Sequence, residues 1–269
     1  MKLVGIIMCM LLAAVAAPVA EAADSPITVT ILYDNTAFAP GTEADWGFSC
    51  LVEGTGKTIL FDTGTKPEVF FQNVEALEID LAEVDLVVIS HEHGDHTGSL
   101  ARVLEQNHDL PVYHPVSFSD GFVSSVKQAG ATSIPVTDPV EIIPDVYLTG
   151  EMGSAIKEQS LILRTGDGLV LITGCSHPGI VEILEKTQQI LDDKIFMVFG
   201  GFHLLRHSEE ETAAIIERFK QLGVEKCGAT HCTGDPQIAA FQKAYSDDFV
   251  PMGTGRVLTL EATGQKPGS

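Results

Sequence analysis

Four potential metal ligands lie within six consecutive residues of this 269-residue chain, in the segment 91–96, which reads His-Glu-His-Gly-Asp-His. An apolar run, residues 84–90, directly precedes this segment and is typical of a buried strand. Loops at strand ends commonly carry active sites because a rigid sheet holds them in place. Imidazole and carboxylate groups suit zinc or iron, and two adjacent ligand sets suit a pair of metal ions.

The spacing within the segment predicts how its ligands divide between two metal positions. His91 and His93 are two residues apart, so in extended backbone their side chains point to the same side. Gly94 would allow a sharp turn, after which Asp95 and His96 can face a second position. The segment therefore predicts a two-metal site rather than a polar turn of solvated histidines.

The pattern of strands and helices predicts an α+β protein. Strands are expected at residues 27–33, 48–52, 57–61, 84–90, 111–114, 160–164, 169–173, 194–199, 224–229 and 256–260. Helices are expected at residues 97–106, 180–191, 208–222 and 235–245. Strand pairs come first in each half and strand–helix units follow, which predicts two mixed sheets packed face to face with helices outside.

Charge and composition narrow the class of partner. The chain has 37 acidic and 16 basic side chains, a net charge of -21 and a pI near 4.6. Nucleic-acid backbones require clusters of Lys and Arg, so nucleic acid is excluded as the main partner and a small-molecule substrate is expected. A 45% hydrophobic composition is ordinary for a globular protein, and we expect a single domain over residues 23–269.

The first 22 residues have the order of parts found in an export signal. Lys2 is followed by an apolar run, residues 3–17, and by the small-residue site Ala-Glu-Ala at 20–22. We expect cleavage after Ala22 and a periplasmic or extracellular protein without membrane contact after cleavage. The alternative is a retained membrane anchor, because the apolar stretch is just long enough to span a bilayer.

The His-x-His-x-Asp-His motif at 91–96, together with Phe-Asp-Thr-Gly at 61–64, resembles the signature of the metallo-β-lactamase superfamily. The resemblance extends over nearly the whole mature chain, from about residue 27 to residue 260. It implies a four-layer αββα sandwich, in agreement with the order of strands and helices expected above.

The resemblance also implies a role for each residue of the two motifs. His91 and His93 would bind the first metal ion, and Asp95 and His96 would bind the second. Asp95 would in addition position a bridging hydroxide between the two ions. Asp62 would assist catalysis by orienting the ligand imidazoles through hydrogen bonds.

Three further ligand positions of the family are less regular here. His231 matches the final His and would bind the second metal ion. Cys175 occupies the place where most members have a bridging Asp, and a thiolate binds zinc well, although a buried structural thiol is the alternative. The usual middle His is missing. Either His177 or the carboxylate of Glu158 could replace it, and we favour His177 because the segment 174–179 concentrates ligands at a strand end.

His203, in Gly-Gly-Phe-His-Leu, is another His at a strand end. We expect it at the rim of the site, in contact with substrate, with Arg206 as an anion contact; a structural His is the alternative for His203. The departures from the usual pattern resemble the branch that contains a dihydropterin ribofuranosyl-aminobenzene phosphate synthase. That substrate does not carry over, because an exported protein is an odd place for pterin biosynthesis.

The resemblance implies a metal-dependent hydrolase in which a metal-bound hydroxide attacks an ester, amide or phosphoester, and the leader segment makes it an exported one. Two divalent ions are expected, with zinc first and iron or manganese also accepted by these ligands. Two alternatives stay open. One is a non-catalytic metal-binding protein, and the other is a di-iron redox protein of the same fold.

Overall fold

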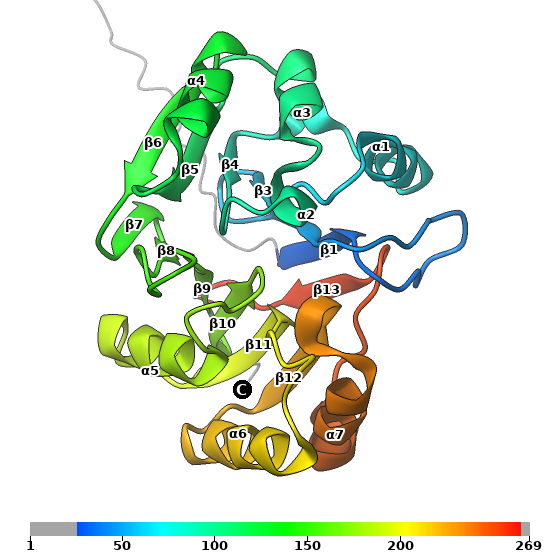
Figure 1. The fold of residues 1–269 in the computed structure, drawn as a ribbon, viewed down its shortest axis with the longest axis vertical. Coiled ribbons are helices and arrows are strands. Elements are labelled where there is room, and N and C mark those ends of the chain that lie inside the picture. The colour runs from blue at the N-terminus through cyan, green and yellow to red at the C-terminus, as the bar shows by residue number, and fades with distance from the viewer. Residues whose placement is uncertain (1–25, 265–269) are drawn as a thin grey trace, which may run out of the picture.

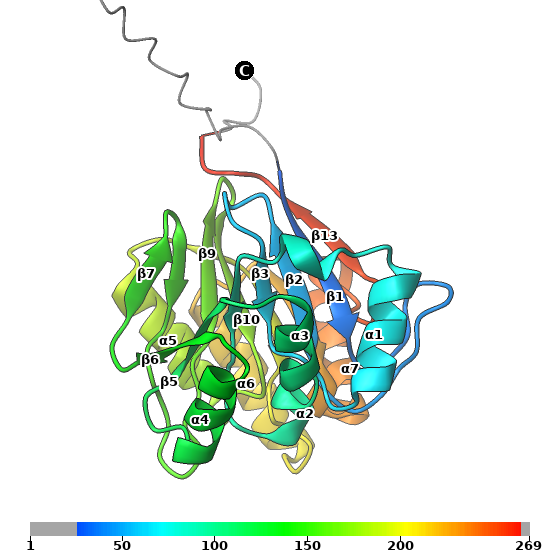
Figure 2. The same cartoon turned by 90° about the horizontal axis from the view of Figure 1, so that it is seen from above.

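The computed structural model describes residues 26–264 (Figures 1 and 2). The expected leader, residues 1–22, lies outside the described residues, as do both ends of the expected 23–269 domain. Within the described part, no helix has the length and apolar character needed to cross a membrane.

The first sheet has seven strands in the spatial order β13-β1-β2-β3-β4-β5-β6. These strands are β1 (Ile27–Tyr33), β2 (Ser49–Glu53), β3 (Ile59–Phe61), β4 (Leu86–Val88), β5 (Pro111–Pro115), β6 (Thr132–Val136) and β13 (Val257–Leu260). Strands β13, β1, β2 and β3 pair antiparallel, whereas β3, β4, β5 and β6 pair parallel. The sheet is therefore mixed, as expected.

The second sheet has six strands in the order β12-β11-β10-β9-β8-β7. They are β7 (Val140–Ile143), β8 (Val146–Leu148), β9 (Leu161–Thr165), β10 (Gly168–Thr173), β11 (Ile195–Gly201) and β12 (Lys226–Thr230). Strands β7 to β10 pair antiparallel, and β10, β11 and β12 pair parallel. Both sheets thus contain a parallel part, in which strand ends of the same kind lie at one edge.

Helices cover the outer face of each sheet (Figure 1). On the first sheet lie α1 (Pro67–Ala76), α3 (Leu100–Gln106) and α4 (Asp120–Gln128), and on the second lie α5 (Ile180–Ile190), α6 (Glu209–Gln221) and α7 (Asp235–Tyr245). Four short helical turns complete the elements: α2 (Gly94–Thr97), η1 (Leu81–Glu83), η2 (His231–Thr233) and η3 (Ser246–Asp248). The result is the αββα sandwich that the sequence predicted.

Side chains of the central strands alternate between the layers. In β3, Ile59 and Phe61 pack in the core between the two sheets, whereas Leu60 packs against the outer helices. In β10, Val170 belongs to the core between the sheets and Leu171 to the outer core of the second sheet. Because both faces of these strands are buried, they are apolar throughout instead of alternating between apolar and polar residues.

The ends of the parallel strands carry the polar motifs. Asp62 follows β3 and His91 follows β4 in the first sheet. Cys175 follows β10, His203 follows β11 and His231 follows β12 in the second. Packing of the two sheets brings these strand ends together, although the residues come from distant parts of the chain.

Several expectations about local structure need correction. The predicted helix 97–106 is divided into α2 and α3, and the predicted strand 84–90 is shortened to β4. Gly94 begins α2 with an ordinary backbone conformation, so the turn between the ligand pairs does not depend on a glycine. Helices α1 and α4 and strands β6 to β8 were not predicted.

Gly98, at the end of α2, is the glycine on which this motif depends. A Cβ atom there would lie 1.9 Å from the carbonyl oxygen of Thr65, whereas a Cβ atom on Gly94 would meet nothing within 4 Å. We therefore expect Gly98→Ala to lower the free energy of unfolding by about 1–3 kcal/mol or more, as overpacking does. Gly94→Ala should leave it within about 0.5 kcal/mol.

Chemical denaturation of the two alanine variants and the parent protein measures this difference. Equal stability of Gly98→Ala and Gly94→Ala would show that the segments around Gly98 and Thr65 are not closely packed.

Candidate metal centre

The first ligand group contains three imidazoles. His91 Nε2 lies 3.1 Å from His93 Nδ1, and the ring of His177 packs against both. One nitrogen from each of these three residues lies within 4.8 Å of the others. The predicted pairing of His91 with His93 is therefore present, and His177 joins them from the second sheet.

The second ligand group has mixed chemistry: Asp95, His96, Cys175 and His231. His96 Nε2 lies 3.3 Å from both His231 Nε2 and Cys175 Sγ. Asp95 Oδ2 lies 3.4 Å from His231 Nε2. Nitrogen, sulfur and carboxylate oxygen atoms thus face one another around a single point, as in a zinc site.

His203 forms a third group with Cys175 and His177, with their ligand atoms again within 4.8 Å of one another. The rings of His203 and His177 have centroids 4.3 Å apart. His203 was expected at the rim, and its exposed side chain agrees with that position, but it is also close enough to act as a ligand. Arg206 is exposed on the same loop and belongs to none of the three groups.

Asp62 orients the second group and is not among the candidate ligands. Its fully buried carboxylate accepts hydrogen bonds from the backbone N–H and the hydroxyl of Ser90, each at 2.7 Å. Its Oδ2 also lies 2.7 Å from His96 Nδ1, so the Nε2 atom of His96 is left free to face the centre. Burial lowers the pKa of His96, but the carboxylates of Asp62, Asp95 and Glu158 together outweigh burial and the pKa is raised.

Glu158 has a different role from the one considered in the sequence. Its buried carboxylate accepts backbone hydrogen bonds from Cys175, Ser176 and His177, at 2.9, 2.8 and 2.8 Å. Burial raises the pKa of Glu158 to about 7. Because the carboxylate already holds the loop and belongs to none of the ligand groups, the structure favours His177 over Glu158 as the replacement for the middle His.

Two contacts to the site were missed in the sequence. Asn35 Oδ1 lies 3.0 Å from His231 Nδ1, and the Asn35 side chain also donates to the His231 carbonyl. Trp46 donates from Nε1 to Asp95 Oδ2 at 2.7 Å, and its ring centroid lies 4.8 Å from that of His231. Asn35 lies just after the predicted strand 27–33, and a polar residue at a strand end could have been recognised as a candidate site residue. No feature of the sequence pointed to Trp46.

The backbone is left-handed at several of these strand ends. The φ angles are 54° at Asp62, 63° at Ser176, 56° at His203 and 51° at His231. Residues other than glycine seldom adopt this conformation, and those that do cluster at functional sites. Three of these positions are a candidate ligand or lie next to one: His203, His231 and Ser176, which precedes His177.

The residues present fit a bound metal ion. His177 Nε2 is buried and has no hydrogen-bond partner among the described residues. Burial, with the neighbouring His203 and His93, lowers the pKa of His177 to about 3, so its ring is neutral. A shielded imidazole nitrogen without a partner, beside other imidazole rings, is the arrangement that a divalent metal ion satisfies.

Replacing Glu158 tests its positioning role. We expect Glu158→Ala to reduce the metal retained per chain after dialysis, because three buried N–H groups lose their acceptor and the loop carrying Cys175 and His177 loosens. Glu158→Gln keeps one acceptor oxygen and should retain an intermediate amount. Glu151→Ala removes a nearby acid that contacts no candidate ligand and is the control. Full metal retention in a folded Glu158→Ala protein would contradict this role.

Comparisons with known proteins agree with this geometry. Residues 47–231 match the family described as the metallo-beta-lactamase superfamily. The 7,8-dihydropterin-6-methyl-4-(beta-D-ribofuranosyl)-aminobenzene-5'-phosphate synthase of Methanocaldococcus jannaschii is 29% identical over 261 residues, which cover 79% of this chain and 89% of that protein.

Two solved structures show the same architecture. A metal-dependent hydrolase of the beta-lactamase superfamily is 30% identical, with a TM-score of 0.73 over 86% of this chain and 98% of its own. The metallo-beta-lactamase fold protein YhfI from Bacillus subtilis is 15% identical, with a TM-score of 0.66 over 87% of this chain and 100% of its own. The expected fold is confirmed, and the chain belongs to the metallo-beta-lactamase superfamily.

Proposed function

We propose that this protein is an exported dinuclear hydrolase that cleaves an ester, amide or phosphoester bond of a small molecule. Its superfamily consists mostly of metal-dependent hydrolases and related enzymes. The observation that carries the proposal is the convergence of two ligand groups, one of three imidazoles and one of mixed donors, at a shared edge of the two sheets.

The ligand groups supply places for two divalent ions, with zinc favoured by the combination of His, Cys and Asp. When bound, such ions activate water and polarise a carbonyl or phosphoryl oxygen. The first ion would be held by His91, His93 and His177. The second would be held by the group that contains His96 and His231.

The protein's own groups prepare the site before any substrate arrives. Asp62 and Asn35 hold the rings of His96 and His231, so that Nε2 of each ring faces the centre. Although burial opposes it, the neighbouring His231 and His96 keep the pKa of Asp95 below its usual value. The ionised Asp95 carboxylate can then accept a hydrogen bond from the attacking water and orient it.

The proposed location and partner class rest on the sequence. Residues 1–22 have the features of an export leader, which supports a periplasmic or extracellular protein. The net charge of -21 supports a small-molecule substrate rather than nucleic acid.

Metal content and turnover together test the proposal. We expect two metal ions per chain by elemental analysis, with loss of metal in His177→Ala and in Cys175→Ala. His108→Ala replaces an exposed histidine outside every ligand group and is the control. The loaded protein should hydrolyse p-nitrophenyl acetate or bis-p-nitrophenyl phosphate with added Zn²⁺, Mn²⁺ or Fe²⁺.

Different failures identify different rivals. Metal uptake without turnover of any ester, amide or phosphoester would favour a metal-binding protein, and oxygen or nitric oxide reduction by an iron-loaded protein would favour the redox alternative. One ion per chain, unchanged in both ligand variants, would rule out the two-metal arrangement.

The single tryptophan of the chain offers a direct report of metal binding. Trp46 contacts Asp95 and His231, two members of the mixed ligand group. We expect Zn²⁺ to change its fluorescence in a saturable titration, and His231→Ala to abolish the change while His108→Ala preserves it. Constant emission during metal uptake confirmed by elemental analysis would mean that Trp46 does not contact the occupied site.

A further inference from the structure

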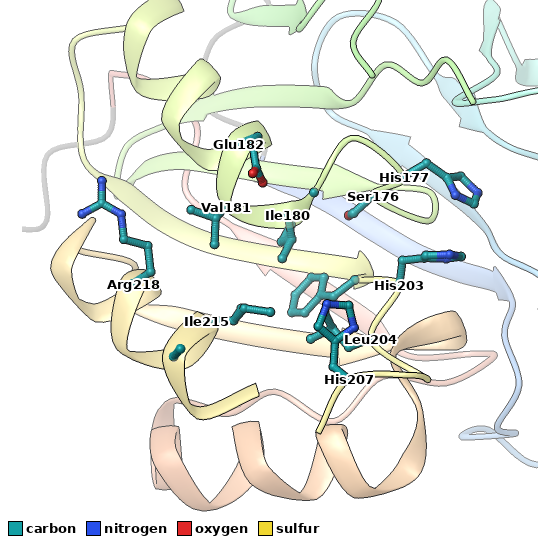
Figure 3. Close-up of a pocket in the computed structure, with 13 residues that line it drawn as sticks. Ser176, His177, Ile180, Val181, Glu182, His203, Leu204, His207, Ile215 and Arg218 are labelled. Atoms are coloured by element: carbon teal, nitrogen blue, oxygen red, sulfur yellow. The ribbon is translucent and has the colours of Figure 1, made fainter. Parts of the chain in front are cut away.

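A cavity of about 470 Å³ lies beside the metal centre, between α5 and α6 (Figure 3). His177 and His203, which belong to the ligand groups, line its inner end. Figure 3 shows Arg218 at the opposite end of the lining, far from these two histidines. The cavity has the size of a small-molecule site, and two residues that would hold metal belong to its lining, with their rings directed away from the other lining residues (Figure 3).

The walls between these two ends are mainly apolar. They consist of Ile180 and Val181 from α5, Phe202 and Leu204 from the segment that follows β11, and Ala214 and Ile215 from α6. Val181, Ala214 and Ile215 are half-buried or exposed, whereas Ile180, Phe202 and Leu204 also belong to the buried outer core of the second sheet. Apolar groups of a ligand that cover such a wall remove apolar surface from water, and this favours binding.

The charged groups near the cavity do not favour an anion. Arg218 donates to Glu185 Oε1 from Nη2 at 2.6 Å, so its charge is already paired. Glu182 adds an acidic side chain to the lining. Arg206, which the sequence suggested as an anion contact, is not among the residues that line the cavity.

One polar group in the lining is available for a directional contact. His207 Nδ1 is shielded from solvent and has no hydrogen-bond partner within the described residues. The sequence gave no reason to single out this histidine. A neutral polar atom of a ligand could pair with it without bringing a charge into the cavity.

We propose that the cavity between α5 and α6 binds an uncharged, apolar acyl group of the substrate whose scissile bond lies at the metal centre. This inference rests on the proposed function and narrows it to esters or amides. His177, His203 and Ile215 all belong to the lining of this one cavity, so a single molecule can contact both places.

Alkyl hydroxamates test this inference without requiring turnover, because they combine a metal-binding head with an acyl tail of chosen length. The measurement is the Kd of acetohydroxamate and of octanohydroxamate for the zinc-loaded full chain, by calorimetry. Each buried methylene can tighten binding by up to about fourfold. We expect the longer compound to bind at least about tenfold more tightly.

A matched pair of variants locates the tail. Ala214 and its neighbour Ala213 are both exposed, but only Ala214 lines the cavity. Ala214→Phe should fill the cavity and bring the ratio of the two Kd values close to one. Ala213→Phe introduces the same ring outside the cavity and should preserve the ratio seen in the parent protein.

Two results would overturn the inference. One is equal affinity of the parent protein for both hydroxamates, including absence of binding, and the other is an unchanged ratio in folded Ala214→Phe. Failure of the proposed function would look different. If the protein shows the chain-length effect but hydrolyses no ester or amide, the cavity binds apolar groups but the protein is not the proposed hydrolase.

Discussion

Burial of two apolar sheet faces against each other is the constraint on which the rest of this structure depends. The shared core includes Phe61 from the first sheet and Phe199 from the second, both fully buried. Once these faces are packed, the ends of β3 and β4 must lie near the ends of β10, β11 and β12. Candidate metal ligands attached to those ends then lie close together. Sheet packing thus sets where the candidate metal centre lies, and the loops after the strands set how its side chains are oriented.

That direction is set by buried polar groups that are themselves not ligands. Asp62 orients His96, Asn35 orients His231, and Glu158 holds the loop that carries Cys175 and His177. Left in isolation, buried carboxylates would be costly, but each of the two accepts several hydrogen bonds here. The left-handed backbone at the strand ends adds local strain, which the surrounding hydrogen bonds and packing offset. Together these features hold the candidate ligands in place through buried hydrogen bonds.

The apolar cavity between α5 and α6 also owes its position to the packing of helices on the second sheet. Helices α5 and α6 cover the second sheet, and the space that remains between them begins at His177 and His203. The reacting bond and the rest of the substrate can therefore occupy adjoining places with different chemistry, one polar and one apolar. Such a division allows binding energy from the non-reacting part to position the reacting part.

The sequence by itself determined the family and the layered fold, and it pointed to most of the candidate ligands. Spacing within 91–96 paired His91 with His93, and apolar runs marked the strands, because both signals are local. The tertiary structure favours His177 over Glu158, since each is a plausible ligand until the Glu158 carboxylate is seen to accept three backbone hydrogen bonds. It also decided the contacts of Trp46 and the cavity beside Ala214. These contacts join residues from distant parts of the chain, and a local sequence pattern carries no information about them.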